Sequence, residues 1–291
     1  MFPRTNVTFV FMITDNPPED YSLLLLRLFQ TNEIPPRRLF HLPIIKMLSR
    51  TNIIPLRRLF HLPIIKMLSQ DQCKKVWRNA DAVCFDVDST VLKDEALDEL
   101  AKFCGVGELV IEWTNKAMGG NVSFREALNE RLKIVQPTRQ KVADFLSQHP
   151  PQFTPGIKEL VSSLSKRGIP VYLVSGGFQS ILVPVAEQLG LPVENIIANR
   201  IKFYYNGDYA GFDENQPTSS SGGKKVVVET LKNKHGYKNL VMIGDGATDM
   251  EACPPADGFI GFGGNIIREK VKQNAPWFVT DMQELINEMK E

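Results

Sequence analysis

The sequence lacks the features that mark several classes of protein. It has only four cysteines in 291 residues, with neither CxxC spacing nor a dense framework, so we expect reduced thiols in a cytoplasmic protein rather than disulfides. No apolar run reaches the roughly 18 residues needed to span a bilayer. The net charge of only +1 argues against binding to nucleic acid or to a membrane surface. The length allows one or two domains, and the hydrophobic content of 43% is ordinary for a globular protein.

The first seventy residues have a composition of their own, rich in arginine and leucine and poor in acids. Residues 31–49 recur almost letter for letter as residues 51–69. Two proline-containing copies do not make a stacked solenoid, which needs at least about three repeats, so we interpret them as a tandem duplication. We predict that residues 1–70 form a poorly ordered, dispensable extension. A mitochondrial presequence is the alternative, with a mitochondrial rather than cytoplasmic location.

Two aspartates follow the apolar run Ala82 to Phe85 in the sequence FDVDSTV. Because side chains alternate along a strand, Asp86 and Asp88 point the same way and Val87 points to the opposite side. Two carboxylates at the end of a buried strand repel each other and lose hydration, so a cation is expected beside them. A simple DxD turn after a strand is the alternative if the pair stands alone.

Three later segments supply chemistry that complements this pair. A second apolar run is followed by Ser175-Gly176-Gly177, whose hydroxyl and amides can hold an anion at the start of the next helix. A Ser-Gly-Gly turn then places the ammonium of Lys224 at the start of a helical segment. A third apolar run ends in GDGATD, where flanking glycines allow close approach of a ligand and bring Asp245 and Asp249 toward one point.

In order and spacing, these segments resemble the four motifs of the haloacid dehalogenase superfamily of phosphotransferases: DxD, then Ser, then Lys, then GDxxxD. Within that superfamily the chain resembles the phosphoserine phosphatase family of animals. The resemblance extends from about Asp81 to the C-terminus and includes the stretches AMGG, YAGFDENQPT and GFIGFGGN. One departure is Lys225, where the family often has glycine, and we expect this second lysine to point to solvent.

The alternation of helical and strand patterns from Asp81 predicts an α/β fold. We expect a doubly wound, Rossmann-like parallel sheet with a small helical cap domain. The sheet domain is assigned to residues 71–93 and 151–291, and the cap to residues 94–150. Ligands bind where parallel strands end, and all four motifs lie there.

Local signals define some of the expected elements. Asp94, Ser123 and Thr138 are predicted to cap the amino ends of three cap helices. A hairpin is predicted around Asn206-Gly207.

The resemblance implies a division of labour among the motif residues. Asp86 attacks phosphorus and forms an aspartyl phosphate, while Asp88 gives a proton to the departing alkoxide and takes one from water. Mg²⁺ suits the hard oxygen ligands, which are the side chains of Asp86 and Asp245 and the backbone carbonyl of Asp88. The remaining roles are phosphoryl binding by Ser175, Gly176 and Gly177, a second positive charge from Lys224, and orientation of Lys224 or a metal-bound water by Asp249.

The resemblance also implies the substrate, phosphoserine, and hence the last step of serine biosynthesis. Glu95 would accept the substrate ammonium, and Arg131 would grip its carboxylate. Other residues implied near the substrate are Met118, Gly119, Thr248 and Arg268. Without the resemblance, the residues indicate only a small phosphate monoester.

Two other classes of function stay open. A phosphotransferase or mutase would use the same Asp86 and transfer the phosphoryl group to a second alcohol instead of water. A non-catalytic binding protein would be expected to lack the nucleophile or the acid/base, and both are present here. The family resemblance further implies a homodimer.

Overall fold

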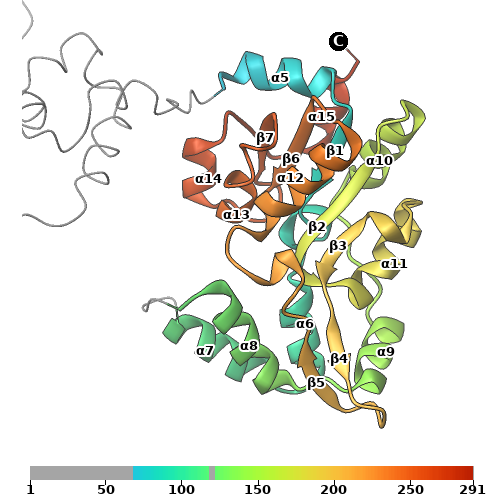
Figure 1. The fold of residues 1–291 in the computed structure, drawn as a ribbon, viewed down its shortest axis with the longest axis vertical. Coiled ribbons are helices and arrows are strands. Elements are labelled where there is room, and N and C mark those ends of the chain that lie inside the picture. Colours follow the sequence, from blue (N-terminus) through green and yellow to red (C-terminus); the bar gives the residue numbers. More distant parts are fainter. Residues whose placement is uncertain (1–67, 118–121, 291) are drawn as a thin grey trace, which may run out of the picture. The chain divides into compact units, whose positions relative to one another are not determined.

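A six-stranded parallel sheet forms the centre of the part of the chain that the structure, a computed structural model, describes: residues 68–117 and 122–290 (Figure 1). The strand order is β3-β2-β1-β6-β7-β8, and all neighbours are parallel. The strands are β1 (Ala82–Phe85), β2 (Val171–Phe178), β3 (Ile196–Asn199), β6 (Leu240–Gly244), β7 (Gly258–Phe262) and β8 (Trp277–Val279). Because the chain adds strands first on one side of β1 and then on the other, the ligand crevice of such a sheet lies at the carboxyl end of β1.

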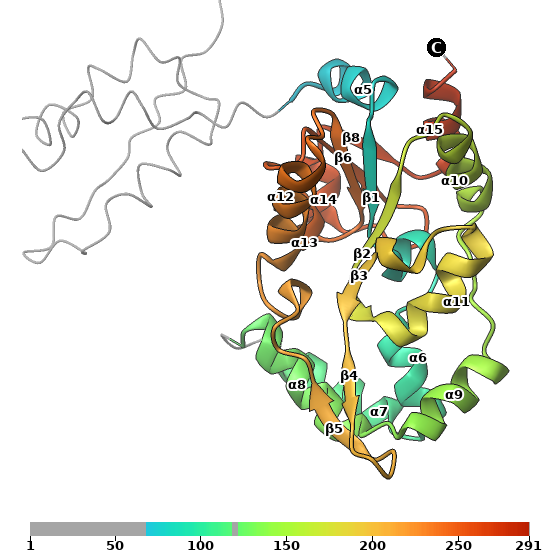
Figure 2. The ribbon, with the colours of Figure 1, turned by 45° about the vertical axis from the view of Figure 1, so that its right-hand side comes forward.

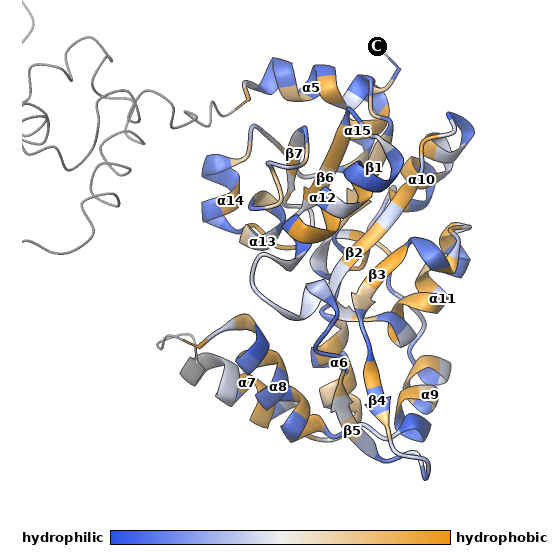
Figure 3. Ribbon diagram, viewed as in Figure 1, coloured by the Kyte–Doolittle hydropathy of each residue, from blue (hydrophilic) through white to orange (hydrophobic). Residues whose placement is uncertain are grey.

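Helices cover both faces of this sheet (Figure 2). Val83 and Phe85 of β1 point into one hydrophobic cluster, and Ala82 and Cys84 point into the other. The first cluster is covered by α10 (Ile157–Lys166), α11 (Gln179–Leu189) and α15 (Met282–Glu288), and the second by α12 (Gly223–His235), α13 (Ala247–Met250) and α14 (Glu269–Asn274). Figure 3 shows β2 and β6 largely in the hydrophobic colour, whereas these helices carry both colours. The predicted doubly wound fold is confirmed.

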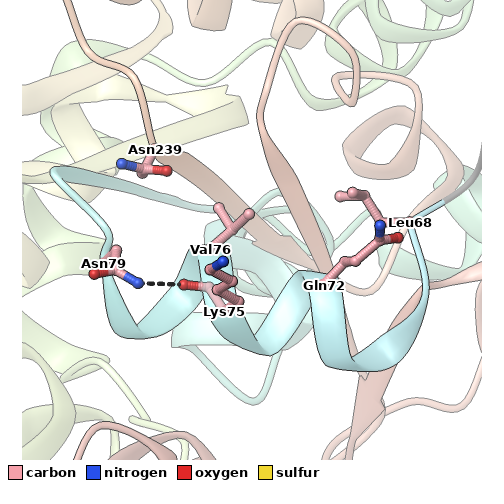
Figure 4. A pocket seen from close by; sticks show the side chains of 6 residues that line it. All are labelled: Leu68, Gln72, Lys75, Val76, Asn79 and Asn239. Atoms are coloured by element: carbon pink, nitrogen blue, oxygen red, sulfur yellow. Dashed lines mark hydrogen bonds between the residues drawn. The ribbon is translucent and has the colours of Figure 1, made fainter.

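Helix α5 (Gln70–Arg78) packs against the sheet through Cys73 and Trp77, which are both buried. Ser69 caps the helix in a capping box with Gln72. A groove of about 510 Å³ runs along α5 and is lined by Leu68, Gln72, Lys75, Val76, Asn79 and Asn239 (Figure 4). Asn79 and Asn239 shortly precede β1 and β6, so this groove lies at the amino edge of the sheet, away from the motif residues.

The chain divides into two units, Met1–Lys66 and Met67–Glu291. The duplicated extension predicted for residues 1–70 lies outside the described residues, except for its last three. Nowhere in 68–117 or 122–290 is a helix both long and apolar enough to cross a membrane.

Four helices follow β1 and share a third hydrophobic cluster with a later hairpin. The helices are α6 (Ala96–Phe103), α7 (Gly107–Ala117), α8 (Phe124–Val135) and α9 (Arg139–Gln148), and the hairpin strands are β4 (Ile201–Phe203) and β5 (Tyr209–Phe212). The hairpin predicted around Asn206-Gly207 is confirmed, with β4 and β5 antiparallel. Phe212 is buried among the helices, so the hairpin packs with residues that lie far from it in the sequence. A strand pattern identifies such a hairpin but not its packing partner.

Two of the three predicted caps of these helices are confirmed, and one is wrong. Ser123 forms a capping box with Glu126, and the Thr138 side chain accepts a hydrogen bond from the backbone N–H of Lys141. Helix α6 begins at Ala96, one residue later than the predicted cap Asp94 requires. The backbone N–H of Ala96 instead donates to Asp88 Oδ1 at 2.8 Å. A carboxylate of the DxD pair thus satisfies the helix terminus that Asp94 was expected to cap.

Candidate active site

Three strand ends and the start of α12 bring the motif residues together. Asp86 directly follows β1, and its backbone N–H donates to the carbonyl of Ile243 on β6, so the first and fourth motifs lie on neighbouring strands. Lys224 is the second residue of α12. Its Nζ lies 2.6 Å from Asp86 Oδ1 and 2.6 Å from Asp249 Oδ1. The predicted positive charge of Lys224 therefore lies beside Asp86, the first aspartate of the DxD pair.

The ion pairs around Lys224 are almost completely buried. Burial alone would lower the pKa of Lys224, but the carboxylates of Asp249 and Asp86 outweigh it and raise the pKa above its usual range. Burial and the charge of Asp86 raise the pKa of Asp249, although Lys224 acts in the opposite direction. One ammonium therefore does not balance the buried carboxylates, and a further cation in this cluster would be electrostatically favoured.

Asp88 has a different environment from Asp86. Its Oδ1 accepts from Ala96, and its Oδ2 lies 3.5 Å from the hydroxyl of Ser175. Burial, followed by the charges of Glu95 and Asp86, raises the pKa of Asp88 to about 7. A carboxyl group with this pKa exchanges protons near neutral pH, as general acid/base catalysis requires. The two aspartates of the DxD pair are thus chemically distinct.

The carboxyl-terminal part of β2 carries Ser175 and two glycines close to the carboxylate of Asp88. The backbone N–H of Gly177 donates to Ser175 Oγ at 2.8 Å. A Cβ at Gly177 would lie 3.1 Å from that oxygen and 3.3 Å from Asp88 Oδ2, in the space beside the acid. The structure thus places the Ser175 hydroxyl close to Asp88, while the Gly177 N–H is occupied by the Ser175 oxygen.

Two residues beside this part of β2 were not singled out in the sequence. Phe124, the first residue of α8, has its ring so close to Gly176 that a Cβ there would lie 2.9 Å from its Cζ. Asn199, which is fully buried, donates from Nδ2 to the carbonyl of Gly176 at 2.8 Å and bonds the backbone and side chain of Thr218. The Ser123 cap marks where α8 begins, but no sequence signal tells which strand end that helix approaches.

The fourth motif holds Asp245 between two elements. Its Oδ1 accepts from the hydroxyl of Thr90, and its Oδ2 accepts from Arg268 Nε at 2.6 Å. Asp249 Oδ2 accepts from the backbone N–H of Gly246, and a Cβ at Gly244 would lie 2.3 Å from the Asp249 carboxyl carbon. The glycine before Asp245 is therefore required by the close approach of Asp249.

These acids form a group whose donor chemistry fits a metal ion. Asp86, Asp245 and Asp249 are buried and each offers a carboxylate oxygen within 4.8 Å of the others. Closely spaced carboxylate oxygens are the hard ligands of Mg²⁺ and related cations. Asp249 was expected to orient Lys224 or a metal-bound water, and it lies within this group of possible metal ligands. The Asp88 carboxylate lies outside the group and contacts Ala96 and Ser175.

Two of the residues assigned to substrate binding, Glu95 and Arg131, form ion pairs within the protein. Glu95 lies at the site, where its Oε1 accepts from Ser89 Oγ at 3.1 Å and lies 3.3 Å from Arg268 Nη2. Burial raises the pKa of Glu95, partly offset by Arg268. Arg131 on α8 pairs with Asp98 on α6.

Of the other residues assigned to substrate binding, Thr248 lies in a described segment, whereas Met118 and Gly119 do not. Thr248 is half-buried in the first turn of α13, next to Asp249. Met118 and Gly119 lie outside the described residues. Lys225 is exposed, as expected.

Comparison with known proteins agrees with this geometry. Residues 80–257 match the family described as haloacid dehalogenase-like hydrolase. The chain belongs to this family. The hydrolase is 59% identical over 220 residues to the phosphoserine phosphatase of Rattus norvegicus, covering 76% of this chain and 98% of that protein. The resemblance drawn from the four motifs is confirmed.

Solved structures extend the similarity to the fold. The hydrolase resembles a substrate-bound phosphoserine phosphatase complex with a TM-score of 0.62 and 27% identity, covering 72% of this chain and 97% of the other. It resembles a phospho-aspartyl intermediate analogue of phosphoserine phosphatase with a TM-score of 0.60 and 27% identity, covering 72% and 98%.

Proposed function

We propose that this hydrolase converts O-phospho-L-serine and water to L-serine and phosphate in a Mg²⁺-dependent reaction, as the last step of serine biosynthesis. The observation that carries the proposal is the pairing of Asp86 with Lys224 beside a second aspartate, Asp88, whose Oδ2 lies 3.5 Å from the Ser175 hydroxyl. The 59% identity to a phosphoserine phosphatase supports the choice of substrate.

Asp86 is the proposed nucleophile. Its Oδ1 accepts from the backbone N–H of Val87 at 2.7 Å and from Lys224, which fixes the orientation of the carboxylate. An oxygen of this carboxylate attacks phosphorus in line with the serine oxygen, so an aspartyl phosphate forms as the ester bond breaks. Attack of water on phosphorus then releases phosphate and restores the carboxylate.

Asp88 is the proposed acid and base. In its protonated form it gives a proton to the departing serine oxygen, and the resulting carboxylate later takes a proton from the attacking water. The bond from Ala96 holds Asp88 Oδ1, so Oδ2, on the side of Ser175, is the oxygen available for this exchange. Replacing Asp88 with Asn should lower kcat by about 10²–10⁴-fold, the usual contribution of a general acid/base.

The transferred group would be held by Ser175, the amides of Gly176 and Gly177, and Lys224. A Mg²⁺ ion held by Asp86, Asp245 and the Asp88 carbonyl would offset negative charge on the phosphoryl oxygens. Asp249 keeps Lys224 oriented through its 2.6 Å contact. Fixed positive groups at the phosphoryl oxygens are the main electrostatic requirement of such a displacement.

The serine part of the substrate would bind between the cap and the sheet, with residues 94–150 acting as the cap domain. Glu95 would accept the ammonium, which competes with Arg268 for the carboxylate. Arg131 would bind the carboxylate, which competes with Asp98 for the guanidinium. Met118, Gly119, Thr248 and Arg268 complete the proposed pocket. We further propose a homodimer located in the cytoplasm.

Phosphate release from a panel of phosphorylated small molecules, with and without Mg²⁺, tests the proposal. O-phospho-L-serine should be hydrolysed fastest, chelation should stop turnover, and Mg²⁺ should restore it. Ca²⁺, which is larger and freer in coordination, should bind without supporting turnover. Full activity in excess chelator would contradict the metal requirement. Transfer of phosphate to an added alcohol in preference to water would instead favour the alternative, a phosphotransferase acting on a small phosphate ester.

A further inference from the structure

Asn265 contacts three oxygen atoms at the junction between the sheet and the cap. It follows β7 after two glycines, and its Nδ2 lies 3.0 Å from the carbonyl oxygen of Ser89, 3.2 Å from that of Leu92 and 2.7 Å from Thr154 Oγ1. The two N–H groups of this nitrogen thus lie within hydrogen-bonding distance of three acceptors, which come from two distant segments of the chain.

These acceptors belong to the two connections that lead into and out of the cap helices. The connections pair with each other: Lys93 N–H donates to Gln152 O and Thr154 N–H donates to Val91 O, both at 2.9 Å. The hydroxyl of Thr154, which is buried, donates to the carbonyl of Thr90 at 2.7 Å. Because that proton is committed to Thr90, Thr154 Oγ1 faces Asn265 as an acceptor.

The turn that Asn265 holds has an unfavourable backbone conformation. Ser89 has a φ of 55°, in the left-handed region that residues other than glycine rarely occupy. The same residue follows Asp88 and donates its side-chain hydroxyl to Glu95. Such conformations persist only where surrounding contacts over-determine them, and the Asn265 amide supplies one of those contacts from outside the turn.

We infer that Asn265 is a positioning residue: it fixes the turn between Asp88 and Glu95 and ties both cap connections to the loop after β7. Asn265 contacts the Ser89 carbonyl and Thr154, and acts on the catalytic carboxylates through them. The inference concerns the proposed phosphatase reaction and rests on it only for the kinetic part of the test.

Replacement of Asn265 by Asp is the sharpest test, because it keeps the size of the side chain and replaces both donors with a charge facing three acceptors. We expect amide hydrogen exchange at Lys93 and Thr154, measured by mass spectrometry on the full chain, to become at least about tenfold faster. With O-phospho-L-serine, kcat should fall at least about tenfold because Asp88 is displaced, and KM should rise because Glu95 is displaced. Asn265→Ala, which lets water reach the carbonyls, should show the same changes to a smaller extent.

Asn274→Asp is the matched control. Asn274 Nδ2 also bonds a carbonyl, that of Lys270, but in an exposed position on α14. This control should leave exchange at the two amides, kcat and KM unchanged. Thr154→Ser, which keeps the hydroxyl, should likewise behave as wild type, whereas Thr154→Val should resemble Asn265→Ala.

Wild-type exchange at Lys93 and Thr154 in both Asn265 variants would overturn the inference, as would a lower melting temperature with unchanged kcat and KM per folded molecule. If Asn265→Asp does not fold, Asn265→Ala and the two Thr154 variants decide the same question. The exchange measurement needs no substrate. Failure of the wild-type chain to hydrolyse phosphoserine would therefore refute the proposed function. The exchange comparison would still test whether Asn265 holds the two cap connections.

Discussion

Lys224 and Asp249 form an ion pair with 2.6 Å between Nζ and Oδ1, and their side chains are only 9% and 0% exposed. The same ammonium holds Asp86. Breaking a buried ion pair by removing one partner typically costs about 3–5 kcal/mol, because the other charge stays buried without compensation. Lys224 therefore contributes to stability as well as to the proposed chemistry.

Replacement of Lys224 by Met should abolish activity and lower the free energy of unfolding by about 3 kcal/mol or more. The double variant Lys224→Met with Asp249→Asn should recover much of that stability, because one of the two unpaired carboxylates becomes neutral, but should stay inactive. Denaturant unfolding and phosphate release measure the two effects. Equal instability of the single and double variants would contradict the role assigned to the Asp249 charge.

Replacement of Asp86 by Asn should abolish hydrolysis while the fold is kept, because an amide is not a nucleophile. In the wild-type protein, mass spectrometry of turnover quenched in acid should find phosphate on Asp86. The circular dichroism spectrum and the melting temperature of the variant serve as controls for folding. Phosphate on a serine or a histidine would refute the proposed covalent step.

Much of the site was predictable from the sequence because its residues lie at strand ends. Parallel strands end at one edge of a sheet, so strand order was enough to bring Asp86 and Asp245 together. The alternation expected for Asp86 and Asp88 was wrong, because β1 ends at Phe85 and Val87–Val91 form a helical turn. The sequence did not predict where the Asp88 carboxylate points. Its direction is set by the backbone N–H of Ala96 at the start of α6, which donates to Asp88 Oδ1. That contact is tertiary and leaves no periodic signal.

The parts of the fold that the sequence did not predict are those that depend on contacts between distant segments. The β4–β5 hairpin was recognised from its turn, but its packing rests on contacts of Phe212 with helices α6 to α9. The pairing of Arg131 with Asp98 likewise joins two helices whose charges, in the sequence alone, are ordinary solvated charges. Asn265 ends the matching stretch GFIGFGGN, but an asparagine after two glycines is typical of any turn, so the sequence did not predict its contacts.

Acid should weaken the attachment of α5 to the rest of the protein. Glu288 on α15 is 5% exposed and pairs with Lys74, at 2.6 Å, and with Arg78 on α5. Although burial raises the pKa of Glu288, the bonds from Lys74 and Arg78 outweigh it and hold the pKa below the usual 4.5. A lowered folded-state pKa means that this stabilisation is complete above pH 4.5 and is lost as the pH falls through the folded value.

The loss should be at most about 1 kcal/mol, because both cationic partners are partly exposed. It is measured as the difference in unfolding free energy between wild type and Glu288→Gln. That difference should shrink as the pH is lowered from 6 to about 3. A difference that is independent of pH would show that Glu288 acts through packing alone.

Truncation of the extension should be tolerated, provided that the helix cap is kept. A chain beginning at Leu68 retains Ser69, whose hydroxyl accepts from Gln72 N–H at 3.3 Å, and should keep wild-type activity and melting temperature. A chain beginning at Gln70 loses this cap and should be less stable by about 0.5–2 kcal/mol, with activity unchanged. Loss of activity in both chains would show that residues 1–67 contribute to the catalytic part.

Substrate choice is tested most directly at Arg131. Phosphoethanolamine keeps the ammonium and the phosphate of phosphoserine but has no carboxylate, so the wild-type protein should prefer phosphoserine. Losing a bidentate charged contact in a closed pocket should cost roughly 2–5 kcal/mol. Arg131→Ala should therefore lower kcat/KM for phosphoserine far more than for phosphoethanolamine.

Two variants complete this test by separating the contacts to the substrate from those within the cap. Glu95→Gln should weaken both substrates, because both carry the ammonium that Glu95 would accept. Asp98→Asn removes the partner of Arg131 without removing the guanidinium, so it should leave the preference for phosphoserine intact or increase it. If Arg131→Ala reduced kcat/KM equally for the two substrates, Arg131 would act through the packing of α8 on α6, and the carboxylate would have to be recognised by another residue.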